Sequence, residues 1–203
     1  MKPVAALIAL TCLGLSAQVE PGGNRMGIGL SAVSPQGDLG SVFGTGFQGG
    51  LQIHFNRESR HLGRLRVDYL RMDSKRPISL GTWAIWNGSA YVPTPQLADS
   101  RMEAYSVAYE WMPHLDPEGR SGFYGIFGMG GTLWNETWRN TTIYTGTDTD
   151  SELGFTLSAG AGWRFNTHAA LEARYVHSDL TFHGHHRYGS ERSYLAFGTS
   201  LRF

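Results

Sequence analysis

The chain of 203 residues contains a single cysteine, Cys12. It lies within a segment typical of a secretory signal, in which Lys2 is followed by an apolar stretch up to Leu15 and then by small residues. We therefore predict a signal peptide over 1–17 and one domain over 18–203. Because Cys12 would leave with the signal, disulfide bonds and thiol chemistry are excluded from the mature chain.

Long apolar runs and an excess of charge are also missing. After the signal no stretch of about 20 apolar residues is present, so no transmembrane helix is expected. The 17 basic residues balance the 17 acidic ones, which gives no reason to expect a nucleic-acid partner. Only Lys2 and Lys75 are lysines, and the other 15 basic residues are arginines. Arginine suits fixed ion pairs in a confined interior better than a solvated surface.

What the chain does contain is strict alternation of residue types. From Leu153 to Phe165 every odd-numbered residue is apolar, and the even-numbered ones are glycine, threonine, serine or arginine. Successive side chains of a strand point to opposite faces, so this strand has one bulky apolar face and one small or polar face. A soluble barrel turns its bulky side chains inward, whereas the reverse suits a narrow barrel surrounded by lipid.

Alternation and turn residues together predict an all-β chain of eight strands. The connections alternate between short ones, such as 166–167, and long ones, such as 74–99. Short periplasmic turns and long extracellular loops are typical of an antiparallel up-and-down transmembrane β-barrel, and an even strand number places both termini on the periplasmic side. The predicted strands span about 24–33, 46–55, 61–73, 100–114, 121–134, 152–165, 168–181 and 191–203.

The polar faces of these strands predict a charged lumen. Eight strands enclose a space that side chains nearly fill, and isolated buried charges are costly, so the charges must pair or keep water. We expect a lumen closed by charged pairs, with a selective channel as the alternative. The inward charged residues are Arg64, Arg66, Asp68, Glu110, Arg164, Glu172, Arg174 and Arg202.

Aromatic residues near the strand ends predict two girdles at the membrane interfaces. The strand 121–134 has glycines on both faces, and we expect Phe127, Met129 and Leu133 to point outward. The girdle expected at the periplasmic rim consists of Phe55, Trp111, Phe123, Trp163, Phe165 and Phe203, and the outer girdle of Phe47, Tyr105, Trp134, Trp138, Phe155 and Tyr175.

The last strand is the most specific signal, because it alternates Leu195, Phe197, Thr199 and Leu201 with small or polar residues and stops on Phe203. It resembles the C-terminal strand by which outer-membrane barrels are recognised by the barrel-assembly machinery. With the signal and the loop asymmetry, the chain resembles the small eight-stranded family typified by the OmpA membrane domain, OmpX and OmpW. The resemblance implies a place in the bacterial outer membrane, contact with its lipids, and Phe203 as an assembly signal.

Catalytic and metal sites are not expected. His177 and Ser178 are neighbours on one strand and point to opposite faces, which argues against a serine hydrolase, and the His-x-Ser-Asn motif of outer-membrane lipid A deacylases is absent. No cofactor is implied. His183, His185 and His186 are weak candidates for a surface metal site, but their spacing matches no closed structural site.

The segment 74–99 is longer and more apolar than an outer loop needs to be, and it contains Trp83, Trp86 and Tyr91. Such a patch either packs over the barrel mouth, extends the neighbouring strands, or docks onto a partner. We therefore expect a structural or surface-interaction role, with 74–99 as the candidate surface for a protein partner. The alternative is transport of small solutes or hydrophobic compounds across the outer membrane.

Overall fold

The computed structural model describes residues 25–55, 61–116, 121–140, 147–179 and 191–203. The described residues form nine strands and one short helix. They are β1 (Arg25–Gln36), α2 (Gly37–Val42), β2 (Gly46–Phe55), β3 (His61–Asp73), β4 (Ile78–Trp86), β5 (Tyr91–Pro113), β6 (Gly122–Asn140), β7 (Thr147–Arg164), β8 (Ala169–Asp179) and β9 (Glu191–Arg202).

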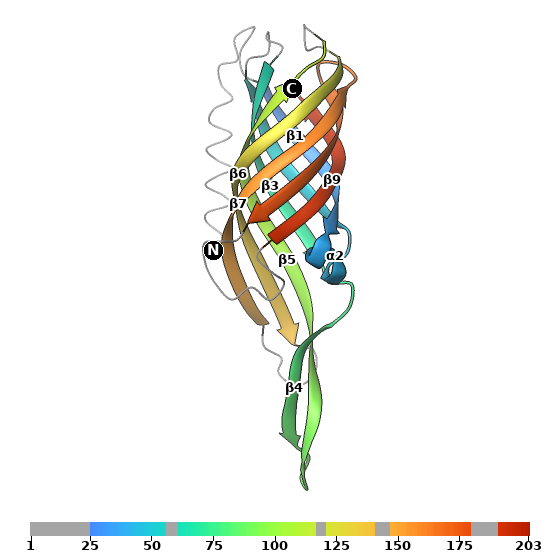
Figure 1. The fold of residues 1–203 in the computed structure, drawn as a ribbon, viewed down its shortest axis with the longest axis vertical. Helices are drawn as coiled ribbons and strands as arrows, with labels where there is room; N and C mark the ends of the chain where they lie inside the picture. Colours follow the sequence, from blue (N-terminus) through green and yellow to red (C-terminus); the bar gives the residue numbers. More distant parts are fainter. Residues whose placement is uncertain (1–24, 56–60, 117–120, 141–146, 180–190) are drawn as a thin grey trace.

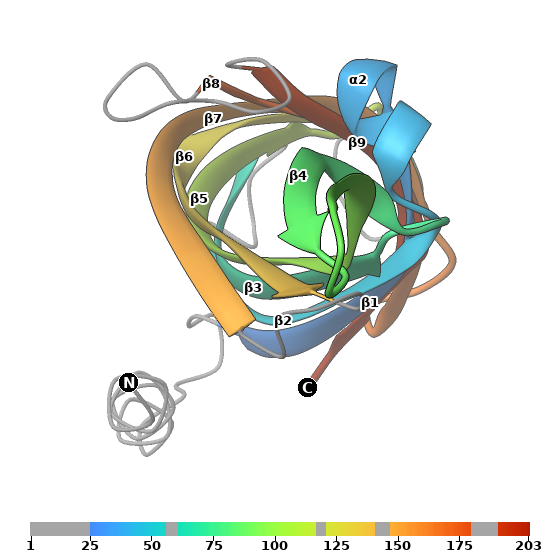
Figure 2. The ribbon, with the colours of Figure 1, turned by 90° about the horizontal axis from the view of Figure 1, so that it is seen from below.

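Eight of these strands close into an antiparallel barrel (Figures 1 and 2). The strand order is β3-β2-β1-β9-β8-β7-β6-β5-β4, and an additional pairing of β3 with β5 closes the ring and leaves β4 outside it. We call the end from which β4 and β5 project the hairpin end, and the opposite end, where β1 begins and β9 ends, the terminal end (Figure 1). The predicted eight-stranded up-and-down barrel is confirmed.

The barrel has its apolar face outside and its polar face inside. Leu157 on β7 is 47% exposed, whereas Arg64 on β3 is completely buried. On β6, where the sequence is ambiguous, Phe127 and Met129 point outward as expected, and Ile126 is buried inside. Large apolar side chains therefore cover the outside of the wall, and the charged side chains of the strands lie inside it.

Two predicted girdle residues were placed on the wrong face. Trp134 and Trp138 are buried inside the barrel, and the Trp134 indole N–H donates to Ser178 Oγ at 3.1 Å. They alternate with the outward Leu133, so the face of the strand decides their position even though tryptophan favours membrane interfaces.

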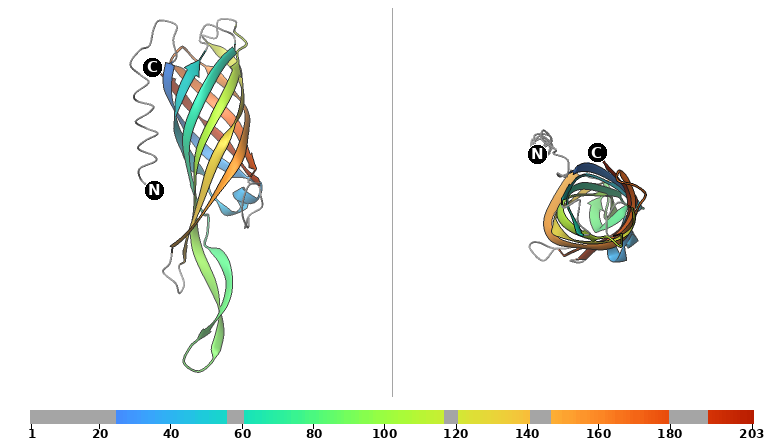
Figure 3. Two further views of the ribbon diagram at one scale, coloured as in Figure 1. Left: turned by 90° about the vertical axis from the view of Figure 1, so that its left-hand side faces the viewer. Right: turned by 90° about the horizontal axis from the view of Figure 1, so that it is seen from above.

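The segment 74–99 is a β-hairpin and not a loop. β4 pairs with the first part of β5, from Trp86 opposite Tyr91 to Ile78 opposite Ala98, with an irregularity between Ser79 and Gly81. The two strands run on as a ribbon beyond the barrel (Figure 3). Of the three arrangements that the apolar composition allows, strand extension is the one that the structure adopts.

Two other long connections are also more ordered than expected. β6 and β7 continue their pairing to Arg139 opposite Thr147, so the expected loop 135–151 is largely strand. The connection after β1 contains the short helix α2, which begins at Gly37 with a φ of +55°, contacts β1 and β9, and buries Leu39.

Close strand contact at Gly198 on β9 predicts a strong effect of a single methyl group. A Cβ at this position would meet the Leu30 carbonyl oxygen and the Ser31 side chain of β1. We expect Gly198→Ala to lower the free energy of unfolding in detergent by about 2 kcal/mol, measured by urea titration.

The matched control is Gly131→Ala on β6, where the nearest atom to an added Cβ is the Gly154 carbonyl oxygen at 3.9 Å. This variant should retain the wild-type midpoint. Equal midpoints for the two variants would contradict the close packing of β9 on β1.

Candidate functional site: the charged lumen and the exposed hairpin

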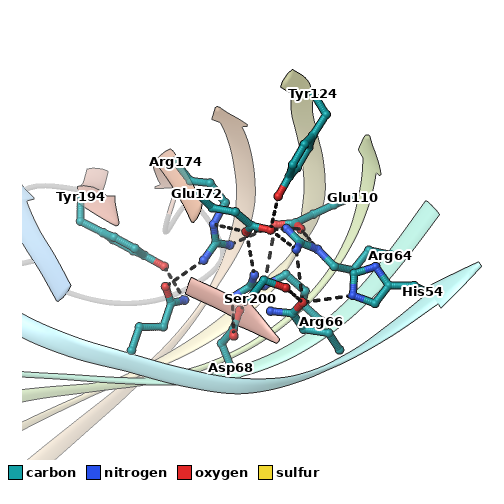
Figure 4. A network of polar contacts seen from close by, with 12 residues as sticks. His54, Arg64, Arg66, Asp68, Glu110, Tyr124, Glu172, Arg174, Tyr194 and Ser200 are labelled. Atoms are coloured by element: carbon teal, nitrogen blue, oxygen red, sulfur yellow. Dashed lines mark hydrogen bonds and ion pairs between the residues drawn. The ribbon is translucent and has the colours of Figure 1, made fainter. Parts of the chain in front are cut away.

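The centre of the lumen is organised around Arg64, which projects from β3 (Figure 4). Its Nε donates to Glu110 Oε2 at 2.6 Å, and its Nη2 donates to Glu172 Oε2 at 2.9 Å. Glu172 also accepts the Tyr124 hydroxyl hydrogen bond at 2.8 Å. One guanidinium thus joins carboxylates from two strands, β5 and β8, and charge-assisted bonds of this kind are the strongest in proteins.

Two further arginines complete this central network. Arg66 pairs with Asp68 at 2.8 Å and lies 3.5 Å from Glu172, and Arg174 pairs with Glu110 at 3.0 Å. Three guanidinium groups therefore face three carboxylates, so their formal charges cancel. Balanced pairing offsets the desolvation that each charge would otherwise suffer in a buried site.

Glycines on neighbouring strands make room for these long side chains. A Cβ at Gly160 would meet Arg174 Cγ at 2.9 Å, which is closer than a real Cβ contact. The glycines that oppose the network in the strand register are Gly50 for Asp68, Gly128 for Glu110, Gly160 for Arg174 and Gly162 for Glu172.

Neutral amides extend the central network. Gln52 Oε1 accepts from Arg64 Nη1 at 3.2 Å and from Ser200 Oγ at 2.8 Å, and Gln48 Oε1 accepts from Arg174 Nη2 at 3.3 Å. Strand parity already assigns both glutamines to the lumen, but nothing in the sequence indicates which charges they meet.

Apolar layers lie on either side of the central network. Towards the terminal end is a cluster that includes Leu62, Met112 and Ile126. Towards the hairpin end is a larger cluster that includes Trp134 and Phe43, the residue that follows α2. Charged and apolar layers thus occupy successive levels of the lumen.

Six of the eight predicted lumen charges meet in the central network, and Arg164 and Arg202 do not. Both are buried nearer the terminal end, and the Arg164 guanidinium lies over the Tyr124 ring, 5.4 Å from its centroid. His114, which follows β5, stacks on the same ring at 4.8 Å. Burial and then the charges of Arg164 and Arg202 lower the pKa of His114 to about 3, so its ring is neutral at pH 7.

The β4–β5 hairpin carries aromatic side chains into solvent. Trp83 is 62% exposed and Tyr91 is 71% exposed, and the Trp86 and Tyr91 rings lie 5.3 Å apart. The turn between the strands is fixed by Asn87, whose side-chain oxygen accepts from the backbone N–H of Ala90 at 3.0 Å. The ribbon is therefore a shaped, apolar projection rather than a polar loop.

Of the remaining candidate residues, only Phe203 lies in the part of the chain that the structure describes. Phe203 is exposed at the terminal end, and its backbone N–H donates to the Met26 carbonyl at 3.0 Å. His183, His185 and His186 lie outside the described residues, as does the segment 1–17. Among the described residues no group of three potential metal ligands occurs. No helix in the described ranges is long and apolar enough to cross a membrane.

A closed eight-stranded wall with its large apolar side chains outside is an integral barrel of the bacterial outer membrane. The chain belongs to the outer membrane protein β-barrel domain family, whose model matches residues 4–203. The hairpin end accordingly faces the cell exterior and the terminal end faces the periplasm.

Solved structures with the same fold include two small surface barrels. The attachment invasion locus protein Ail of Yersinia pestis is 13% identical, with a TM-score of 0.51 over 89% of this chain and 97% of Ail. Neisserial surface protein A, NspA, is 14% identical, with a TM-score of 0.52 over 89% of this chain and 97% of NspA. At sequence identities this low, the similarity shows a shared fold alone. No curated protein matches the sequence.

Breaking the central network should destabilise the barrel far more than breaking a surface pair. We expect Glu172→Gln to lower the free energy of unfolding by about 3 kcal/mol, because Arg64 would keep a buried charge with one carboxylate fewer. Urea titration of the folded and unfolded gel bands measures this value.

The matched control is Asp73→Asn, which weakens the exposed pair of Asp73 with Arg101 at 3.0 Å. A change below about 0.5 kcal/mol is expected there. A Glu172→Gln variant as stable as this control would show that the central network contributes little to the fold.

Proposed function

We propose that the protein is a closed outer-membrane barrel with a structural and surface-interaction role, and that it is neither an enzyme nor an open pore. The observation that supports this most directly is the central network, in which three arginines and three carboxylates, all buried, cross the lumen between two apolar layers. Such a filling supports a lumen without the continuous polar path that hydrated ions need.

Transport through the side of the barrel is less well supported. A lateral opening for hydrophobic compounds requires a gap in strand pairing. Over the described residues, the eight barrel strands pair with their neighbours without a register shift, and the irregularity between Ser79 and Gly81 lies in the hairpin. An unbroken ladder favours a continuous wall.

Conductance in planar bilayers tests the closed lumen. We expect no steady single-channel steps from the wild-type protein. The double variant Arg64→Ala/Glu110→Ala removes one charge of each sign and two large side chains from the centre, so it should produce steps.

The control Asp73→Ala/Arg101→Ala removes a charge pair that lies outside the lumen, and it should remain silent. Heat-modifiable gel migration checks that each variant is folded. Steady steps from the wild-type protein would refute the closed lumen.

The proposed surface role is supported by the β4–β5 hairpin. Monomeric proteins rarely expose several aromatic side chains together on a projecting element, and aromatic residues dominate the centres of protein interfaces. Ail, which shares the fold, is named for attachment and invasion and has been crystallised with a heparin analogue. We assign the hairpin as the contact surface for an extracellular protein partner.

Adhesion of cells that display the protein tests this role. On a panel of immobilised extracellular-matrix proteins, Trp83→Ala/Trp86→Ala/Tyr91→Ala should reduce adhesion by about tenfold, because these side chains supply the exposed apolar area.

The control Thr147→Ala/Thr149→Ala changes exposed residues at the start of β7, near the same end of the barrel, and should adhere like the wild type. Equal adhesion of the aromatic variant and this control, or no adhesion by the wild type, would refute the assignment.

We further propose that 1–17 is a signal peptide for secretion and that the barrel-assembly machinery recognises Phe203. The support for the second point is that Phe203 follows β9, is 68% exposed, and lies at the end of the barrel that faces the periplasm.

A further inference from the structure

The terminal end of the lumen carries several cationic side chains at one level. Arg202 and Arg25 project inward from the end of β9 and the start of β1, and Arg164 does so from the end of β7. His54 lies close by at the end of β2. The central network, which lies deeper in the lumen, has no spare charge to offer these groups because its own charges cancel.

Strand register brings three of these residues together. Arg202 lies opposite Gly27 on β1, and Arg25 is the next inward residue of β1, opposite His54 on β2. Diagonal neighbours on one face of an antiparallel pair are about 7–8 Å apart, which is within reach of two arginine side chains. Their guanidinium groups therefore share the mouth of the lumen.

Each of these three side chains has one buried nitrogen without a hydrogen-bond partner among the described residues. Arg202 is only 8% exposed, and its buried Nη2 has no hydrogen-bond partner among the described residues. The same holds for Arg25 Nη1 and for Nδ1 of the fully buried His54. Buried polar atoms without a partner are rare in proteins, and a bound ligand or ion is one partner that accounts for them.

The donor and acceptor roles of these three atoms define the kind of ligand that they would bind. Two guanidinium groups offer paired donors that match the oxygens of a phosphate. His54 differs, because its Nε2 lies 3.2 Å from Gln52 Oε1, an oxygen that already accepts from Arg64. Nε2 therefore carries the proton, and Nδ1 is left as an acceptor. Monohydrogen phosphate supplies both the acceptors and one P–O–H donor, and a phosphate monoester does so as its monoanion.

The charge of the described side chains points the same way, because Arg202, Arg25 and Arg164 are all cationic and an anion is the partner that guanidinium groups favour. The unsatisfied atoms that carry the assignment belong to Arg202, Arg25 and His54, and Arg164 contributes only charge.

We infer that the periplasmic mouth of the lumen binds a phosphate group, held by Arg202 and Arg25 with His54 as the acceptor for its hydroxyl. The group belongs either to free phosphate in the periplasm or to a lipid phosphomonoester of the inner leaflet. This site is independent of the hairpin and lies at the opposite end of the lumen.

Calorimetric titration of the folded barrel in detergent with inorganic phosphate tests the site. We expect the wild-type protein to bind phosphate, and Arg202→Gln and Arg25→Gln each to weaken binding about tenfold. Arg202→Lys keeps the charge and should bind with intermediate affinity, which separates loss of the site from loss of the fold. The control Arg101→Gln changes an exposed arginine at the hairpin end and should bind like the wild type.

Absence of phosphate binding by the wild type would overturn the assignment, and so would binding that persists in Arg202→Gln/Arg25→Gln. The source of the bound phosphate group is identified by measuring the uptake of free phosphate by the barrel in phosphatidylcholine nanodiscs with or without phosphatidate. If phosphatidate prevents the uptake of free phosphate, the site takes a lipid headgroup, and if uptake is unchanged, it takes the soluble ion. Either result supports the site.

Discussion

In the hydrocarbon core of a membrane each backbone N–H and C=O needs a partner within the protein, because no water is present to supply one. The pairing of β3 with β5 meets this requirement by closing the sheet, and the remaining architecture follows from it. A closed ring of eight strands has a lumen about as wide as its own side chains. The interior must therefore be filled, and any charge within it must find its counter-charge across that small space.

The central network is the way in which this chain meets that demand. Arg64, Arg66 and Arg174 are long enough to cross the lumen, and glycines lie opposite Arg174 and the three carboxylates. Carboxylates from β3, β5 and β8 balance the three positive charges. The cations at the terminal end stand outside this balanced set, which is why that end of the lumen is suited to an external anion.

Outside the membrane the constraint is relaxed, because water satisfies exposed backbone groups. There β4 pairs with β5 alone, and the ribbon extends beyond the barrel with its aromatic side chains in solvent. Elements that the barrel does not need for closure are the ones free to carry recognition, as is usual for loops on a rigid scaffold. The proposed structural role and the proposed surface role thus lie in different parts of one chain.

The sequence by itself determined the number of barrel strands, the outward face of β7 and β9, and the inward position of the charged residues, because alternation is a local property of each strand. Trp134 and Trp138 follow the same local alternation, and only the preference of tryptophan for membrane interfaces argued for the outer face. The sequence did not determine which of three arrangements 74–99 adopts, or that Arg164 and Arg202 stand apart from the other charges. The second of these features depends on register and level between strands far apart in the chain. Only the closed tertiary structure decides which side chains meet across the lumen, since that depends on how far each strand is displaced along its neighbours.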